Sequence, residues 1–123
     1  MTSYKHEHTH LTSPDPEKAV DFYVKIMGAE VVKEQIIGGQ KTVDLDMGGI
    51  TIRISGGTAA DKVWEGPRYG LHHLGLVVNN IDAVIADLKS KEVTFVVEPI
   101  PGTKAAFIKG PDNVLFELSG ESN

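Results

Sequence analysis

The sequence repeats itself at a spacing of about 65 residues, and this repeat limits the possible folds more than any other feature of the chain. Sliding the first half onto the second by 65 positions places His8 on His73 and Asp15 on Asn80. Near the end of each half, a slide of 64 aligns the strings GITIRISG and NVLFELSG. Two short copies that each expose an apolar face can bury those faces by packing together. One domain built from two modules is therefore expected.

Each half of the chain has the same order of predicted elements: one strand, one helix and three further strands. In the first half, Asp15 followed by proline is typical of a helix start, and apolar residues at helical spacing continue to a stop at Gly28. The strands EVVKEQII, KTVDLDM and ITIRIS follow, separated by Gly-Gly turns. The second half repeats this order with LHHLGLVV, the helix NNIDAVIADLKSKE, and the strands VTFVVE, KAAFIK and VLFELS. The sequence therefore predicts one domain with modules 1–55 and 71–123 and a linker at 56–70.

Composition excludes several classes of protein. The net charge of −5, from 12 basic and 17 acidic residues, argues against a nucleic-acid surface or an anionic membrane as partner. No apolar run reaches the roughly 18 residues of a membrane span, and the polar start lacks the apolar segment of a signal peptide. The absence of cysteine removes disulfides, thiolate catalysis and cysteine-bound zinc. We expect a cytoplasmic protein without nucleic-acid or membrane partners.

Three of the five histidines, His6, His8 and His10, stand at alternate positions before the first helix. Strand alternation would place all three on one face. The repeat distinguishes His8, because only His8 has a counterpart 65 residues later, at His73. His10 is then a candidate hydrogen-bond donor or proton carrier near neutral pH, and His6 a solvated strand residue. The same alternation predicts that His72 points away from His73 and is structural.

Arg53 is predicted to lie opposite an aspartate. If Gly48–Gly49 form a two-residue hairpin turn, Asp44 stands directly across from Arg53 on the neighbouring strand. Such a cross-strand ion pair stabilises a sheet by roughly 0.2–1 kcal/mol. Alternatively, Arg53 binds a carboxylate or phosphate of a substrate with its fork of donors.

In this order of motifs the sequence resembles the vicinal oxygen chelate superfamily, over nearly the whole chain. The second module carries the resemblance in the strings HLGLVVNNIDA and GPDNVLFEL. The first module carries it in the ordered set His8, Asp15, Glu17, Ala19, Phe22, Tyr23 and Gly28. The resemblance implies an α+β fold in which two βαβββ modules form a curved mixed sheet with a concave cleft.

The resemblance also implies a metal site. In the family, the first residue of each module's opening strand is often a ligand, which implies His8 and His73, and the last strand can add a carboxylate, which implies Glu117. The matching position of the first module is Arg53, which has no lone pair to offer a cation. Two histidines and one carboxylate leave open coordination positions and suit one divalent ion, whether Fe, Mn, Co, Ni or Zn. By strand alternation, Arg53 and Glu117 both lie on the face opposite the helices.

Two functional classes follow from the resemblance. The first is a metal-dependent enzyme of lyase, isomerase or dioxygenase type that chelates a small oxygenated metabolite, with the metal as Lewis acid. The candidates for its base are His10, a metal-bound hydroxide and a displaced ligand, and Arg53 is the candidate contact for the substrate. The second is a metal-free protein of the bleomycin-resistance type that sequesters a small molecule in a cleft lined by aromatics such as Trp64 and Tyr69. Since family modules pair within a chain or across a dimer, we also expect a homodimer.

The well-known branches of the family do not match this sequence fully. Glyoxalase I places a carboxylate, and the epimerases an amide, where Arg53 stands. Extradiol dioxygenases carry a tyrosine where this chain has Phe107, and a histidine upstream, whereas residues 92–106 contain none. The reaction branch therefore stays open at the level of sequence.

Overall fold

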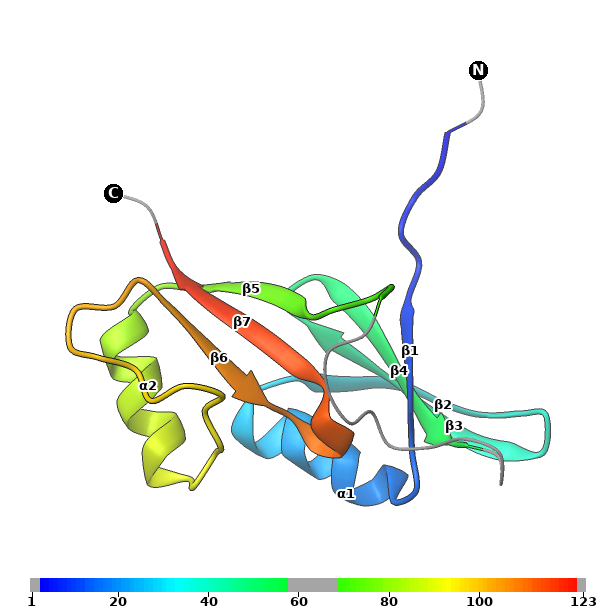
Figure 1. The fold of residues 1–123 in the computed structure, drawn as a ribbon. Helices are drawn as coiled ribbons and strands as arrows, with labels where there is room; N and C mark the ends of the chain where they lie inside the picture. Colours follow the sequence, from blue (N-terminus) through cyan, green and yellow to red (C-terminus); the bar gives the residue numbers. More distant parts are fainter. Residues whose placement is uncertain (1–2, 58–68, 122–123) are drawn as a thin grey trace. The chain divides into compact units, whose positions relative to one another are not determined.

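The computed structural model describes residues 3–57 and 69–121 (Figure 1). The chain divides into two compact units, Met1–Lys62 and Val63–Asn123, which we call unit 1 and unit 2. They correspond to the two modules of the repeat, and their union in one domain remains a prediction.

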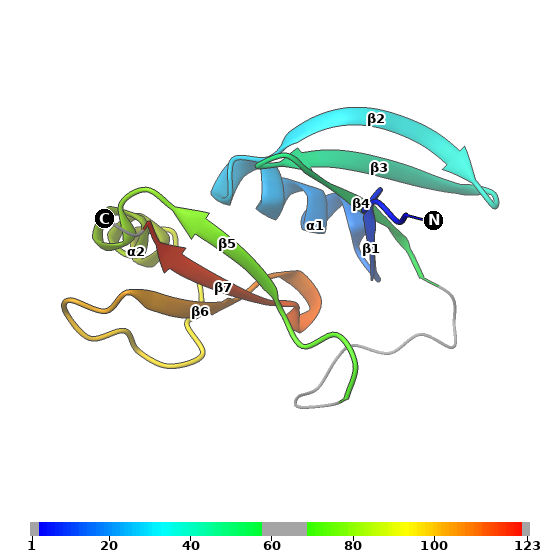
Figure 2. The ribbon, with the colours of Figure 1, turned by 90° about the horizontal axis from the view of Figure 1, so that it is seen from above.

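Unit 1 is a mixed four-stranded sheet with one helix. Its elements are β1 (Thr9–Ser13), α1 (Pro16–Asp21), a π-helical turn η1 (Phe22–Ile26), β2 (Glu30–Ile37), β3 (Gln40–Met47) and β4 (Ile50–Gly56). The strand order is β1-β4-β3-β2, with β1 parallel to β4 and the other neighbours antiparallel. In Figure 2, α1 lies along one face of this sheet.

Local chemistry explains where the helix of unit 1 begins and ends. The Asp15 side chain accepts the backbone N–H of Lys18 at 3.1 Å, which is the expected cap. The last turn widens into η1, where the N–H of Met27 donates to the carbonyl of Phe22 at 3.4 Å. Gly28 follows with a φ of +76°, a conformation that glycine adopts without strain. The predicted helix is confirmed, with a π-helical end.

The hairpin between β3 and β4 has the predicted register. Gly48 and Gly49 both have positive φ, which a two-residue hairpin turn of type I′ requires. The turn pairs Met47 with Ile50, and further along the ladder Asp44 lies opposite Arg53. Every side chain of β4 is therefore assigned to its face by the turn alone.

Unit 2 repeats this plan with three strands in the part of the chain that is described. Its elements are β5 (Leu74–Val78), α2 (Ile81–Ser90), β6 (Ala105–Lys109), a 3₁₀ turn η2 (Pro111–Asn113) and β7 (Leu115–Gly120). The strand order is β5-β7-β6, with β5 parallel and β6 antiparallel to β7. Asn80 caps α2 by accepting the N–H of Ala83 at 3.1 Å, as Asp15 does for α1. The two caps lie at the spacing of the repeat.

Three predicted strand boundaries are wrong. The segment VTFVVE forms a single bridge, Phe95 to Ile108, instead of a strand. Val96 and Val97 within it are 46% and 74% exposed, so little apolar burial stabilises a longer pairing. β1 begins only at Thr9 and β5 only at Leu74, so His72 and His73 lie before a strand and the alternation of a strand does not apply to them.

Each unit buries apolar side chains from the strand faces that the alternation predicts. In unit 1, Ile52 and Ile54 of β4 belong to the core together with Leu45 and Tyr23, and all four are at most 1% exposed. In unit 2, the buried residues include Ile108 of β6 and Phe116 and Leu118 of β7. Arg53 and Glu117, which alternate with these residues, are left on the other face of their sheets. Among the described residues, no helix is long and apolar enough to cross a membrane.

Candidate functional site

The sheet registers place Arg53 and Glu117 at equivalent positions of the repeat. In unit 1 the parallel pairing of β1 with β4 sets His10 opposite Arg53. In unit 2 the parallel pairing of β5 with β7 sets Gly75 opposite Glu117. Gly75 stands 65 residues after His10, the spacing of the repeat. A basic side chain in one unit therefore occupies the place of a carboxylate in the other.

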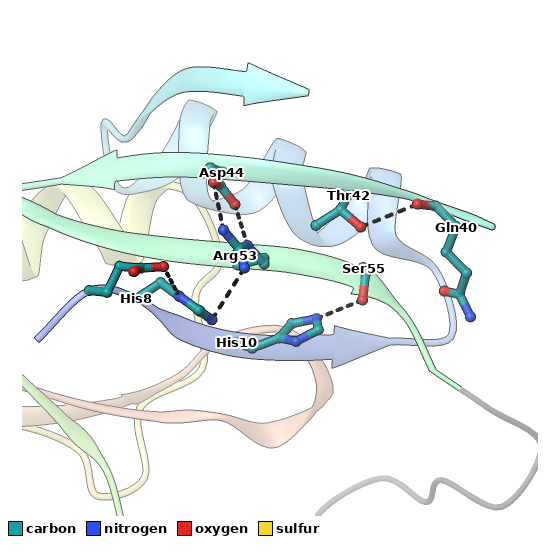
Figure 3. A network of polar contacts seen from close by, with 8 residues as sticks. His8, His10, Gln40, Thr42, Asp44, Arg53 and Ser55 are labelled. Carbon is teal, nitrogen blue, oxygen red and sulfur yellow. Dashed lines mark hydrogen bonds and ion pairs between the residues drawn. The ribbon is translucent and has the colours of Figure 1, made fainter. Parts of the chain in front are cut away.

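His8 lies just before β1, with its ring between an acid and a base (Figure 3). Its Nε2 is 3.3 Å from Arg53 Nη1, and its Nδ1 is 3.0 Å from Glu7 Oε1. Since a guanidinium has only donors, Arg53 donates to Nε2, and the ring proton lies on Nδ1, from which it is donated to Glu7. The side chain of His8 is 30% exposed. No pattern in the sequence predicted Glu7 as its partner.

Arg53 forms the predicted ion pair with Asp44, in a bidentate arrangement. Nε donates to Oδ1 at 2.8 Å and Nη2 donates to Oδ2 at 3.2 Å (Figure 3). The hydrogen bonds from Arg53 lower the pKa of the Asp44 carboxyl; burial opposes this shift, and the charges of Arg53, Lys33 and His8 add to it. Asp44 is therefore ionised near pH 7, and its buried carboxylate holds the guanidinium in place.

His10 donates a hydrogen bond into the sheet. Its Nε2 lies 2.7 Å from Ser55 Oγ, and the Ser55 hydroxyl donates to the carbonyl of Gly56 at 3.1 Å. Ser55 is thus the acceptor, and the proton of His10 lies on Nε2. Partial loss of water around the ring lowers the pKa of His10, the charges of Arg53 and His8 lower it further, and Asp44 opposes them. The imidazole is neutral near pH 7, with its lone pair on Nδ1.

Unit 2 brings together two of the three predicted ligands. His73 Nε2 lies 3.9 Å from Glu117 Oε1, and both side chains are about one-third exposed. Phe107 stands opposite Glu117 in the ladder, and its ring and that of His73 are nearly perpendicular at a centroid distance of 5.2 Å. The three side chains therefore share one site on the face of the unit 2 sheet.

The prediction that His72 points away from His73 is wrong. Their Nδ1 atoms are 2.8 Å apart, and their rings meet edge to face. Both residues precede β5, so the alternation of a strand does not apply to them. One Nδ1 donates to the other, and when His73 is the donor its Nε2 keeps a lone pair on the side of Glu117.

The donor atoms of unit 2 fit a divalent ion. Histidine nitrogen and carboxylate oxygen bind zinc at about 2.0–2.2 Å, so two such atoms 3.9 Å apart can share one ion. A second ring nitrogen held by a hydrogen bond, as in His73, is usual for a metal-binding histidine. Within residues 3–57 and 69–121, no three His, Asp or Glu side chains form a complete metal group.

The remaining candidate residues have few contacts that bear on the site. His6 is exposed, with its Nε2 3.0 Å from Thr9 Oγ1. Tyr69 is fully exposed, and Trp64 lies outside the described residues.

Comparisons with known proteins identify the family. The model of the Glyoxalase/Bleomycin resistance protein/Dioxygenase superfamily matches residues 5–118. The chain is 29% identical over 124 residues to human mitochondrial methylmalonyl-CoA epimerase, covering 90% of this chain and 70% of that protein. It is 26% identical over 128 residues to a probable lactoylglutathione lyase of Vibrio cholerae, covering 96% and 91%.

A solved structure shares the fold. The fosfomycin resistance protein FosX of Listeria monocytogenes, complexed with Mn(II) and 1S,2S-dihydroxypropylphosphonic acid, superposes with a TM-score of 0.78 at 21% identity. The match covers 98% of this chain and 95% of FosX. Together with the family match, which spans both units, this confirms the resemblance to the vicinal oxygen chelate superfamily. The chain therefore belongs to the Glyoxalase/Bleomycin resistance protein/Dioxygenase superfamily and has its α+β, glyoxalase-like fold.

Proposed function

We propose that the protein is a metal-dependent enzyme acting on a small oxygenated metabolite, with His8, His73 and Glu117 as ligands of one divalent ion. The observation that carries the proposal is the 3.9 Å separation of His73 Nε2 and Glu117 Oε1. This pair offers a cation a neutral nitrogen and a carboxylate oxygen on one sheet face. A divalent ion bound there would act as a Lewis acid toward a substrate oxygen.

His10 is the proposed base. Ser55 Oγ orients the ring by accepting a hydrogen bond from its Nε2–H, which leaves the lone pair on Nδ1. In the parts of the chain that are described, no hydrogen bond involves Nδ1. A neutral imidazole with a lone pair and a lowered pKa can accept a proton near pH 7.

Arg53 is the proposed contact for an anionic group of the substrate. The Asp44 carboxylate accepts hydrogen bonds from Nε and Nη2 of Arg53. Nη1 of Arg53 lies on the side of His8 and has a second N–H besides the one that it donates to His8. Because the bidentate pair fixes the plane of the guanidinium, this N–H has a defined direction. A carboxylate or phosphate is the chemistry that such a donor recognises.

Within the family, we propose a lyase or isomerase reaction. Human methylmalonyl-CoA epimerase and the probable lactoylglutathione lyase of Vibrio cholerae are among its curated relatives, and their similarity to this chain extends through both units. A homodimer in the cytoplasm is proposed with it, from the family and the composition. Light scattering after size exclusion tests the assembly, and a monomeric mass contradicts it.

Metal titration tests the proposed function. Calorimetry with Mn(II) or Zn(II) on tag-free protein should give one ion per chain. Glu117→Gln should weaken binding by about tenfold or more, because the amide lacks the carboxylate charge. Glu121→Gln, an exposed carboxylate of the same unit, is the matched control and should bind as the wild type does. No binding by the wild type, or equal binding by Glu117→Gln, overturns the proposal.

One observation favours the alternative, a metal-free protein of the bleomycin-resistance type that sequesters a small molecule. Arg53 occupies in unit 1 the position that Glu117 occupies in unit 2, and it donates to His8 Nε2. A guanidinium there opposes a cation. Retention of a small molecule by protein that binds no metal on titration is the result that this alternative predicts.

A further inference from the structure

The two units contain the same pair of positions with opposite chemistry. In unit 2 the pair is His73 with Glu117, and the histidine Nε2 faces a carboxylate oxygen at 3.9 Å. In unit 1 the pair is His8 with Arg53, and the histidine Nε2 accepts an N–H at 3.3 Å. The first arrangement attracts a cation. The second already contains one, the guanidinium.

The guanidinium is held firmly in this place. Two hydrogen bonds join it to Asp44, which is 6% exposed and lies opposite Arg53 in the β3–β4 ladder. The side chain of Arg53 is itself only 19% exposed. Moving it away from His8 therefore means breaking a bidentate, largely buried ion pair or turning the guanidinium about it.

The ring of His8 is oriented from the other side as well. Its Nδ1 proton is donated to Glu7 Oε1 at 3.0 Å, so Nε2 carries the lone pair. That lone pair is the one that Arg53 occupies. A metal ion bound to Nε2 needs the same lone pair and meets a positive charge next to it.

We propose that Arg53 is an internal competitor of the metal ion: it occupies His8 Nε2, and a divalent ion binds His8 only by displacing the guanidinium. This inference rests on the proposed function in that His8 is a metal ligand. It makes Arg53, an outer neighbour of the ligand set, the residue that limits the metal affinity of the site. Removing Arg53 should then improve metal binding, the opposite of what removing a site residue normally does.

Calorimetric titration with Mn(II) tests this on four proteins: the wild type, Arg53→Met, His8→Ala, and the variant that carries both Arg53→Met and His8→Ala. Met keeps the length of the arginine stem and removes the donors and the charge. Because Arg53→Met leaves buried Asp44 without its partner, a further variant, Asp44→Asn with Arg53→Met, removes the unpaired negative charge of Asp44. Thermal melts establish that each variant is folded.

A matched control separates the hydrogen bond from the general effect of charge. Lys33 lies opposite Asp44 on β2, on the side away from β4, and it is exposed. Lys33→Met removes one positive charge near Asp44 and leaves the contact between Arg53 and His8 in place. It should bind Mn(II) with wild-type affinity to within about twofold, because exposed charges are screened.

The expected result is that Arg53→Met, and the variant that also carries Asp44→Asn, bind Mn(II) about tenfold more tightly than the wild type, since a lost competing hydrogen bond to a charged group has this order of effect. The gain should be absent when His8→Ala is added. Equal or weaker binding by both Arg53→Met variants, or an equal gain from Lys33→Met, overturns the inference while the proposed function stands. If the wild type binds no Mn(II) and Arg53→Met binds it through His8, the inference holds and the proposed metalloenzyme fails. If neither binds, both fail.

Discussion

Arg53 on β4 and Asp44 on β3 form a bidentate ion pair, with 2.8 Å between Nε and Oδ1 and 3.2 Å between Nη2 and Oδ2. The pair is set by the hairpin register and lies largely out of water. It fixes the guanidinium beside His8 and so connects the stability of unit 1 with the chemistry of the candidate site.

The ion pair should be measurable as stability. Asp44→Asn leaves a neutral acceptor against a fixed guanidinium, so we expect a loss of about 1–3 kcal/mol in the free energy of unfolding, as for hydrogen bonds to charged groups. Urea unfolding measures it. Asp46→Asn is the matched control, because Asp46 is exposed on the same strand and an amide can still accept the N–H of Gly49 that it now accepts at 3.1 Å. Equal stability of the two variants contradicts the prediction.

The same carboxyl should make stability depend on pH in acid. The pKa of Asp44 is lowered in the folded protein, chiefly by the hydrogen bonds from Arg53, and takes its ordinary value of 3.8 in the unfolded chain. Its contribution is therefore fully present above the unfolded pKa and is lost as the pH falls through the lower folded pKa. Urea unfolding from about pH 6 down to about pH 3 should show a steeper loss for the wild type than for Asp44→Asn. Parallel profiles would count against this.

His72 should support metal binding through His73. The Nδ1 atom of His72 lies 2.8 Å from Nδ1 of His73 and can accept a hydrogen bond from it. The proton of His73 is then held on Nδ1, and its Nε2 is left with a lone pair for a metal. Replacing such an outer partner typically costs about tenfold or more in affinity, which is the loss expected for His72→Phe in a calorimetric Zn(II) titration. His72→Asn, whose amide oxygen can accept the same proton, should recover most of the loss. The idea is wrong if Phe binds as tightly as histidine.

Ser55 should determine the tautomer of His10. The neutral ring carries its proton on Nε2 because Ser55 Oγ, 2.7 Å away, accepts it. Ser55→Ala removes the acceptor, so we expect the Nδ1-protonated form to become populated. Long-range ¹H–¹⁵N correlation spectra distinguish the two forms. Thr12→Ala changes the exposed residue opposite Ser55 on β1 and should leave the tautomer as it is. Identical spectra for all three proteins would refute the assignment.

Several features of the fold could be predicted from local rules. The caps at Asp15 and Asn80, the Gly48–Gly49 turn and the ion pair that follows from its register are all confirmed. Each depends on chemistry within a few residues or on a turn that fixes the pairing of two strands. The strand predicted at VTFVVE does not form. Pairing of such a segment depends on burial by neighbours that are distant in sequence, and local rules do not describe them.

The site could be predicted only in part. The repeat paired His8 with His73 and Arg53 with Glu117, and these pairs fall in equivalent places of the two sheets. The ligand roles of His8, His73 and Glu117 came from the resemblance to the family and stay predictions. It could not show that His72 bonds to His73, because alternation holds only inside strands and both residues lie before β5.

The sequence by itself determined the repeated modules, their caps and hairpin, and the identity of the polar residues on each strand face, because these follow from spacing and turn geometry. Only the tertiary structure decided what each of those residues touches. His8 and Arg53 are 45 residues apart in the chain, and the parallel pairing of β1 with β4 brings their side chains to 3.3 Å. A hydrogen bond at that range depends on where strands begin and how side chains turn, which no local pattern specifies.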